Sequence, residues 1–195
     1  MCSSDLYDPS DLIFRAIRDL LDAGKISADT FRFLWIGDIP KWLARVVTRL
    51  RLDDVFQSTG QIPRDEAARH LRRVSVLLVR IVRPCLSTKL FEGLAAGVPI
   101  LATIEPGEAE TLVRRYSRRF YIVRPSDAEG VQAALLDAYH RWETGEVQQR
   151  ADDGYLRTFN KGALTDAFAT ALDEVAGEHR RGAVPSLMLE HDGTV

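Results

Sequence analysis

Cysteine, net charge and long hydrophobic runs are all scarce in this 195-residue chain. Its two cysteines, Cys2 and Cys85, cannot build a disulfide framework and lack the spacing of a metal site, so we expect a protein of the reducing cytoplasm. A net charge of -2 gives no argument for nucleic-acid binding. No run approaches the ~18 apolar residues of a membrane-spanning helix. A peripheral contact with a membrane surface stays open.

What is present is typical of a water-soluble globular protein. The chain is 46% hydrophobic and 28% charged, and its length suits one domain with a substantial core. We expect residues 1–175 to form this domain. Residues 176–195 show no hydrophobic period and are predicted to be a flexible tail.

Apolar runs alternate with amphipathic segments along the chain. Strands are predicted in five apolar runs, at residues 31–38, 54–60, 74–82, 98–103 and 119–125. Helical spacing is predicted at residues 11–24, 40–52, 63–74, 88–97, 107–118, 127–142 and 160–177. Continuous apolar strands are buried on both faces, which favours an α/β fold with a Rossmann-like, doubly wound parallel sheet.

The order of the predicted elements has one irregularity. A doubly wound unit opens with a strand, but the first predicted element here is a helix, and residues 1–7 are too polar for a buried strand. Either the fold starts unusually or the chain is the latter half of a longer protein. A missing first strand would leave unpaired backbone in the middle of the sheet.

The segment "STKLFEGLAAGVPILAT", residues 87–103, carries the clearest chemistry. Ser87 and Thr88 are good helix caps, so a helix is predicted to start near Lys89, after a strand. The backbone N–H groups of a helix start bind phosphate, and Lys89 adds a positive charge. Glu92, one turn later, suits the two hydroxyls of a ribose. The helix dipole alone also favours a glutamate there, so a purely structural role stays open.

The same segment resembles the donor-binding motif of GT-B glycosyltransferases of the family 4 type, roughly S-K-L-x-E-x-L-A-x-G-x-P-I-L-A. The resemblance extends from about residue 12 to residue 175, with the other predicted elements in matching order. It implies the carboxyl-terminal, donor-binding half of a transferase that uses a UDP-, GDP- or dTDP-sugar. In such enzymes transfer retains the anomeric configuration and needs no bound metal or other cofactor.

The resemblance also implies roles for particular residues. Glu92 would hold the ribose, and the backbone of Ser87 and Thr88 would meet the diphosphate. The nucleobase would lie beside the loop after the second predicted strand, and the sugar near the loop after the fourth. The predicted donor-binding residues are Ser87, Thr88, Lys89, Glu92, Gly60, Gln61, Ile62 and Gly107. No catalytic residue is assigned.

The sequence departs from that family at two points. Pro84 stands where many relatives have an acidic residue near the sugar, and an acceptor-binding half is not part of the matched region. Activity would then require a second domain or chain. Two alternatives remain open at this level, a degenerate non-catalytic nucleotide-binding or interaction module and one half of a nucleotide-sugar epimerase.

Overall fold

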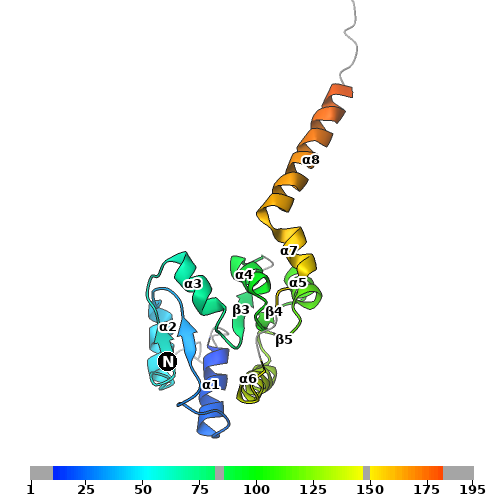
Figure 1. The fold of residues 1–195 in the computed structure, drawn as a ribbon. Coiled ribbons are helices and arrows are strands. Elements are labelled where there is room, and N and C mark those ends of the chain that lie inside the picture. The colour runs from blue at the N-terminus through cyan, green and yellow to red at the C-terminus, as the bar shows by residue number, and fades with distance from the viewer. Residues whose placement is uncertain (1–10, 82–85, 147–149, 182–195) are drawn as a thin grey trace, which may run out of the picture. The chain divides into compact units, whose positions relative to one another are not determined.

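A computed structural model describes residues 11–81, 86–146 and 150–181 of the chain, with side chains described up to residue 176 (Figure 1). Contacts divide the chain into two compact units, residues 1–155 and residues 156–195. The boundaries predicted from the sequence, 1–175 and 176–195, stay predictions.

The predicted parallel strands are confirmed. The first unit contains β1 (Phe33–Trp35), β2 (Phe56–Ser58), β3 (Leu77–Ile81), β4 (Ile100–Ile104) and β5 (Phe120–Val123). Every strand pair is parallel, as in Phe33 with Phe56 and Leu77 with Ile100. The strands nevertheless form two sheets rather than one, β1-β2 and β3-β4-β5. Within the described residues, β1 and β3 are not paired with each other.

The two sheets match a doubly wound sheet of six strands in which the described strands occupy five of the six positions. The common order of such a sheet is 3-2-1-4-5-6. Here β2 and β1 take places 3 and 2, and β3, β4 and β5 take places 4, 5 and 6. The remaining place is the one that the sequence analysis identified, that of the strand before the first helix.

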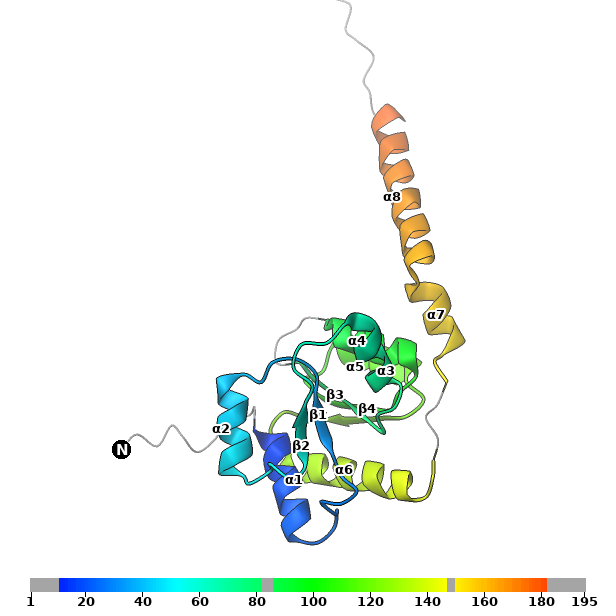
Figure 2. The same cartoon turned by 60° about the vertical axis from the view of Figure 1, so that its left-hand side comes forward.

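Helices cover both sides of these strands. In Figures 1 and 2, α3, α4 and α5 lie on one side and α1 and α6 on the other. Their bounds are α1 (Leu12–Asp22), α2 (Lys41–Arg49), α3 (Arg64–Leu71), α4 (Thr88–Ala96), α5 (Glu108–Tyr116) and α6 (Ala128–Glu143). The sequence pattern predicted each of these six helices, with differences of one to a few residues at their ends.

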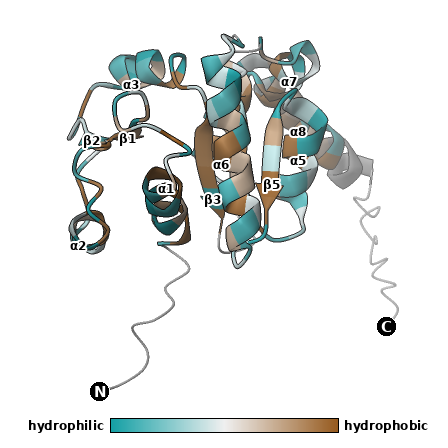
Figure 3. Cartoon of the chain, turned by 90° about the horizontal axis from the view of Figure 1, so that it is seen from below, coloured by the Kyte–Doolittle hydropathy of each residue, from teal (hydrophilic) through white to brown (hydrophobic). Residues whose placement is uncertain are grey.

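One cluster of buried apolar side chains reaches both sheets. The amphipathic face of α1 buries apolar side chains such as Phe14 and Ile17, and α1 packs along α6. The core cluster joins these helices to α2 and to strand β4 through Leu43 and Leu101. Figure 3 shows α6 in front of strands β3 and β5. Helix packing, rather than strand pairing, therefore joins the two sheets.

A buried carboxylate adds a polar link between α1 and α2. Asp11, which precedes α1, is only 2% exposed. It accepts two hydrogen bonds of 3.0 Å from Arg15 and a further ion-paired contact from Arg49 of α2. Two arginines thus compensate the burial of one carboxylate.

The remaining helices are α7 (Asp153–Phe159), which the sequence pattern did not predict, and α8 (Lys161–Arg181). Helix α8 exposes an apolar stripe at helical spacing, formed by Leu164, Phe168, Leu172 and Val175. It extends past residue 175, where the flexible tail was predicted to begin. None of the described helices combines the length and hydropathy needed to cross a membrane.

Candidate functional site

The amino end of α4 lies at the carboxyl end of the strands, as predicted. Ser87 has an extended backbone, and its hydroxyl oxygen accepts a 3.3 Å hydrogen bond from the N–H of Lys89. Within the described residues, the backbone N–H of Thr88 donates to no acceptor. Leu90 and Leu94 are buried and hold the inner face of the helix. The helix therefore offers the N–H of its first residue, Thr88, at the exposed amino end.

Two glycines explain how this helix fits. A Cβ on Gly93 would lie 2.5 Å from Leu77 Cδ2, so the absent side chain lets α4 approach β3 closely. Gly97 ends the helix in the left-handed conformation, with φ of 67°, and its N–H bonds back to the last turn. The predicted start and stop of this helix are both confirmed.

Lys89 and Glu92 project outward from this helix. The Lys89 ammonium lies 5.8 Å from the ring centroid of Trp35, at the end of β1. The Glu92 side chain is 51% exposed, and its Oε1 is 3.7 Å from Nη2 of Arg64, the first residue of α3. This ion pair is long and solvent-exposed, so it holds Glu92 only weakly. Both side chains are accessible to a ligand.

The loop after β2 is tied to the loop after β1. Gly60, with φ of 62°, forms a bridge to Gly37 through a 3.0 Å hydrogen bond. The side-chain amide of Gln61 donates to Asp38 at 2.9 Å, while Ile62 is half-buried. The contacts of Lys89 with Trp35 and of Arg64 with Glu92 bring these loops beside α4. The structure thus gathers seven of the eight predicted residues on one edge.

Gly107, the eighth predicted residue, lies after β4 and precedes the first turn of α5. No hydrogen bond or ion pair links it to Glu92, although its strand ends at the same edge of the sheet. Arg124 anchors the surroundings of this loop, because it donates to the Ile104 carbonyl at 3.0 Å and to Glu110 at 2.8 Å. Hydrogen bonds from Arg124 and Arg114 lower the pKa of Glu110.

Three residues at this edge were not among the predicted ones, namely Trp35, Asp38 and Arg64. Arg64 starts the helix that follows the loop predicted to lie beside the nucleobase. Its place in the sequence could therefore have marked it as a candidate for the site. Trp35 and Asp38 belong to a loop that nothing in the local pattern connected to α4. Pro84 and Cys85, which precede α4 in the sequence, lie outside the described residues.

The described residues contain no cluster of three or more His, Cys, Asp or Glu side chains arranged to hold a metal ion. The groups that this edge does offer are one helix N–H, that of Thr88, two cations, Lys89 and Arg64, and the exposed carboxylate of Glu92. Cations and N–H groups suit phosphate oxygens, and a carboxylate suits hydroxyl groups. The arrangement can therefore bind a phosphorylated ligand that also carries neighbouring hydroxyls.

Comparison with known families gives a match to the model described as Glycosyl transferases group 1, over residues 4–141. Two curated relatives share the name putative colanic acid biosynthesis glycosyltransferase WcaL. The protein of Escherichia coli (strain K12) is 26% identical over 166 residues, which are 80% of this chain and 40% of that protein. The protein of Salmonella typhimurium (strain LT2) is 23% identical over 154 residues, 74% of this chain and 37% of that protein.

Among solved structures, the pneumococcal O-GlcNAc transferase GtfA, in complex with UDP and GlcNAc, is similar in fold. The TM-score is 0.61 at 12% sequence identity, covering 86% of this chain and 33% of that one. At this identity the similarity establishes the fold alone, that of a GT-B enzyme. The chain spans less than half the length of the curated relatives that it matches.

Proposed function

Since the chain belongs to the group 1 glycosyl transferases, we propose that residues 1–155 bind the donor substrate of such an enzyme, a nucleotide-diphosphate sugar. The observation that carries this proposal is the amino end of α4, with exposed Glu92 one turn inside it and Lys89 beside it. The family match supports a transferase over the epimerase half or a non-catalytic module.

In this proposal each group at the edge has one task. The backbone N–H of Thr88, together with the Lys89 ammonium, binds the diphosphate. The Glu92 carboxylate leaves Arg64 and accepts hydrogen bonds from the two ribose hydroxyls. The base lies against Gly60, Gln61 and Ile62, and the sugar reaches toward Gly107.

The same groups would contribute to the transfer step. Negative charge grows on the diphosphate as its bond to the sugar breaks, and the Thr88 N–H and the Lys89 ammonium stabilise that charge. We propose that transfer retains the anomeric configuration and needs no metal. Because the chain spans less than half of its curated relatives, the acceptor would be bound by further polypeptide, in the same protein or a partner.

Titration calorimetry with UDP tests the site directly. We expect Glu92→Ala to weaken UDP binding about tenfold or more, because a hydrogen bond to a charged group contributes roughly 1.5–3 kcal/mol. The test is sharper with 2′-deoxy-UDP, which lacks one of the two hydroxyls. The natural chain should prefer UDP, and Glu92→Ala should bind both nucleotides alike.

Glu105→Ala is the matched control, because Glu105 is an exposed carboxylate at the end of β4. It should leave UDP affinity unchanged. Equal UDP affinity of the natural chain and Glu92→Ala would refute the role of Glu92. A preference for UDP over 2′-deoxy-UDP that survives Glu92→Ala would place the ribose elsewhere.

A further inference from the structure

A second charged feature lies at the opposite end of the strands from the candidate donor site. A cleft of about 360 Å³ opens where β3, β4 and β5 begin. Its lining comes from the residues that follow α3 and precede β3, from those just before β4 and β5, from Tyr121 of β5 and from the end of α6. Four arginines and one glutamate contribute to it: Arg72, Arg73, Arg119, Arg141 and Glu146.

Two of the four arginines are already occupied. Arg141 donates to Glu146 at 2.9 Å and to Asp137 at 2.6 Å, and Arg119 forms an ion pair with the same glutamate. Asp137 also accepts a 2.6 Å hydrogen bond from Tyr121, and the pKa of its carboxyl is lowered by Tyr121 and Arg141. Both acidic groups are therefore neutralised by their neighbours.

The other two arginines of the cleft have no acidic partner within the described residues. Arg72 and Arg73 have exposed side chains that make no ion pair or hydrogen bond within the described residues. They also line a neighbouring cavity of about 510 Å³, next to Arg69 and His70. Arg72 caps the carboxyl end of α3, where a cation is favoured by the helix dipole. Stabilisation of the helix dipole explains one positive charge at this position. The cleft is lined by two adjacent guanidinium groups, so the second has no such structural explanation.

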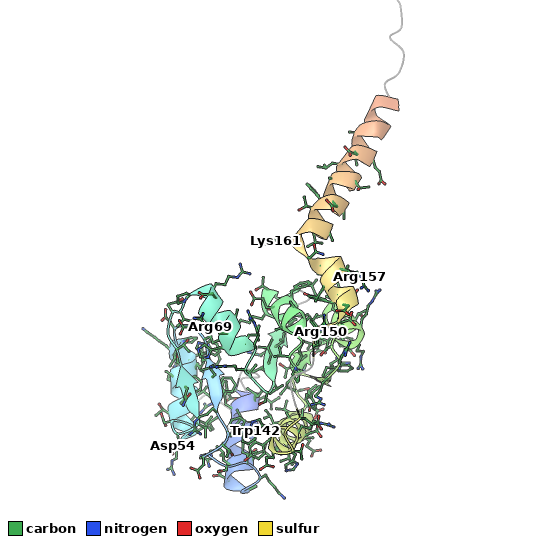
Figure 4. The ribbon with its side chains drawn as sticks, viewed as in Figure 1. Asp54, Arg69, Trp142, Arg150, Arg157 and Lys161 are labelled. Atoms are coloured by element: carbon green, nitrogen blue, oxygen red, sulfur yellow. The ribbon has the colours of Figure 1, made fainter. Side chains whose placement is uncertain are left out.

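An aromatic ring completes the lining. Trp142, near the end of α6 (Figure 4), is 44% exposed and lies 5.8 Å from the ring of Tyr139. A flat apolar ring beside free guanidinium groups suits a ligand with one apolar face and one oxyanion. Guanidinium groups bind carboxylates and phosphates in pairs of hydrogen bonds, and a ring packs on the C–H face of a sugar.

From these contacts we infer that the cleft at the amino ends of β3, β4 and β5 binds a saccharide carrying an acidic group. The acid is a carboxylate or a phosphate, bound by Arg72 and Arg73, and the sugar packs on Trp142. The site is separate from Glu92 and α4 and does not depend on nucleotide binding there. Its volume fits one or two sugar units.

Binding of glucuronic acid, glucose 1-phosphate, glucose and inorganic phosphate, measured by ligand-observed NMR at low salt, tests this inference. One or both acidic sugars should bind, and the tighter one identifies the acid. Glucose and inorganic phosphate should bind at least about tenfold more weakly, because each offers only half of the contacts. Arg72→Ala and Arg73→Ala should each weaken the acidic sugar about tenfold.

Three further variants separate the explanations. Trp142→Ala should weaken the acidic sugar but leave inorganic phosphate unaffected. Arg45→Ala, which removes an exposed arginine of α2, and Glu92→Ala should leave the cleft unaffected. The inference is overturned if no acidic sugar binds, if phosphate alone binds as tightly, or if binding survives in both Arg72→Ala and Arg73→Ala with their fold intact by circular dichroism.

Discussion

The two sheets of the first unit differ in how deeply they are buried. In the three-stranded sheet all five residues of β4 are buried, and α4, α5 and α6 pack directly on its strands. In the two-stranded sheet no residue of β1 or β2 is fully buried, and α3 buries no residue at all. The two-stranded sheet therefore depends for its position on α1 and α2.

This difference matters because the candidate donor site takes residues from both sheets. Helix α4 packs on the deeply buried three-stranded sheet. Trp35 ends β1 of the two-stranded sheet, called the shallow sheet below, and Gly60 and Arg64 follow its strand β2. A ligand that contacts both would restrain the shallow sheet, so donor binding and local stability are coupled. Three experiments test this contrast between the sheets.

The largest effect is expected from a matched pair of core truncations, Leu43→Ala in α2 and Ile100→Ala in β4. Both side chains are 0% exposed. Each loss should lower the free energy of unfolding by roughly 2–5 kcal/mol. Hydrogen exchange should show where the loss appears. Leu43→Ala should speed exchange in β1 and β2 while β4 stays protected, whereas Ile100→Ala should speed exchange in β3, β4 and β5.

The contrast fails if Leu43→Ala speeds exchange in β4 as much as in β1. In that case the two sheets would open as one cooperative unit, and the separation seen in their hydrogen bonds would have no energetic counterpart.

An intermediate effect is expected on lowering the pH. Hydrogen bonds from Arg124 and Arg114 lower the pKa of Glu110 from its ordinary 4.5, so this carboxylate stabilises the fold above that pH. The contribution is lost as the pH falls through the lowered pKa in the folded state. Urea unfolding at pH 7 and pH 3 should show that Glu110→Gln loses less stability on acidification than the natural chain.

Asp54→Asn is the control for that experiment. Asp54 is exposed before β2, in the region of the shallow sheet, and forms no ion pair within the described residues. Its pH dependence should equal that of the natural chain. An equal loss in Glu110→Gln and the natural chain would show that the arginine contacts do not stabilise the three-stranded sheet.

The smallest effect is expected at Thr103 in β4. This residue is only 7% exposed, and its hydroxyl oxygen has no hydrogen-bond partner in the described part of the chain. Valine has nearly the same shape without the unpaired hydroxyl, so Thr103→Val should raise the free energy of unfolding by about 1 kcal/mol. Thermal unfolding measures this change. A lower melting temperature would indicate that the hydroxyl has a partner.

The sequence predicted most of the fold because its signals are local. Apolar runs marked the five strands, and Ser87 and Gly97 marked the two ends of α4. Helix α7 was missed because it is short and its segment carries too few apolar residues to show a period. The division into two sheets depends on which strands pair, and pairing is decided by tertiary contacts that no local pattern contains.

The site was predictable to a similar extent. The α4 residues stand together in one motif, and the helix start supplies a physical reason for phosphate binding. The contacts of Lys89 with Trp35 and of Arg64 with Glu92 join elements far apart in the chain. Only the folded arrangement brings them together, which is why the ion pair that Glu92 must leave was not foreseen.

The separation of the two sheets also bears on self-association of the protein. In the described residues β1 and β3 each have one edge that pairs with no strand, and such edges promote aggregation. Leu77, Leu78 and Val79 make the β3 edge apolar, but exposed Arg80 follows them. A charge on an open edge opposes self-association, so we expect Arg80 to favour solubility at high concentration.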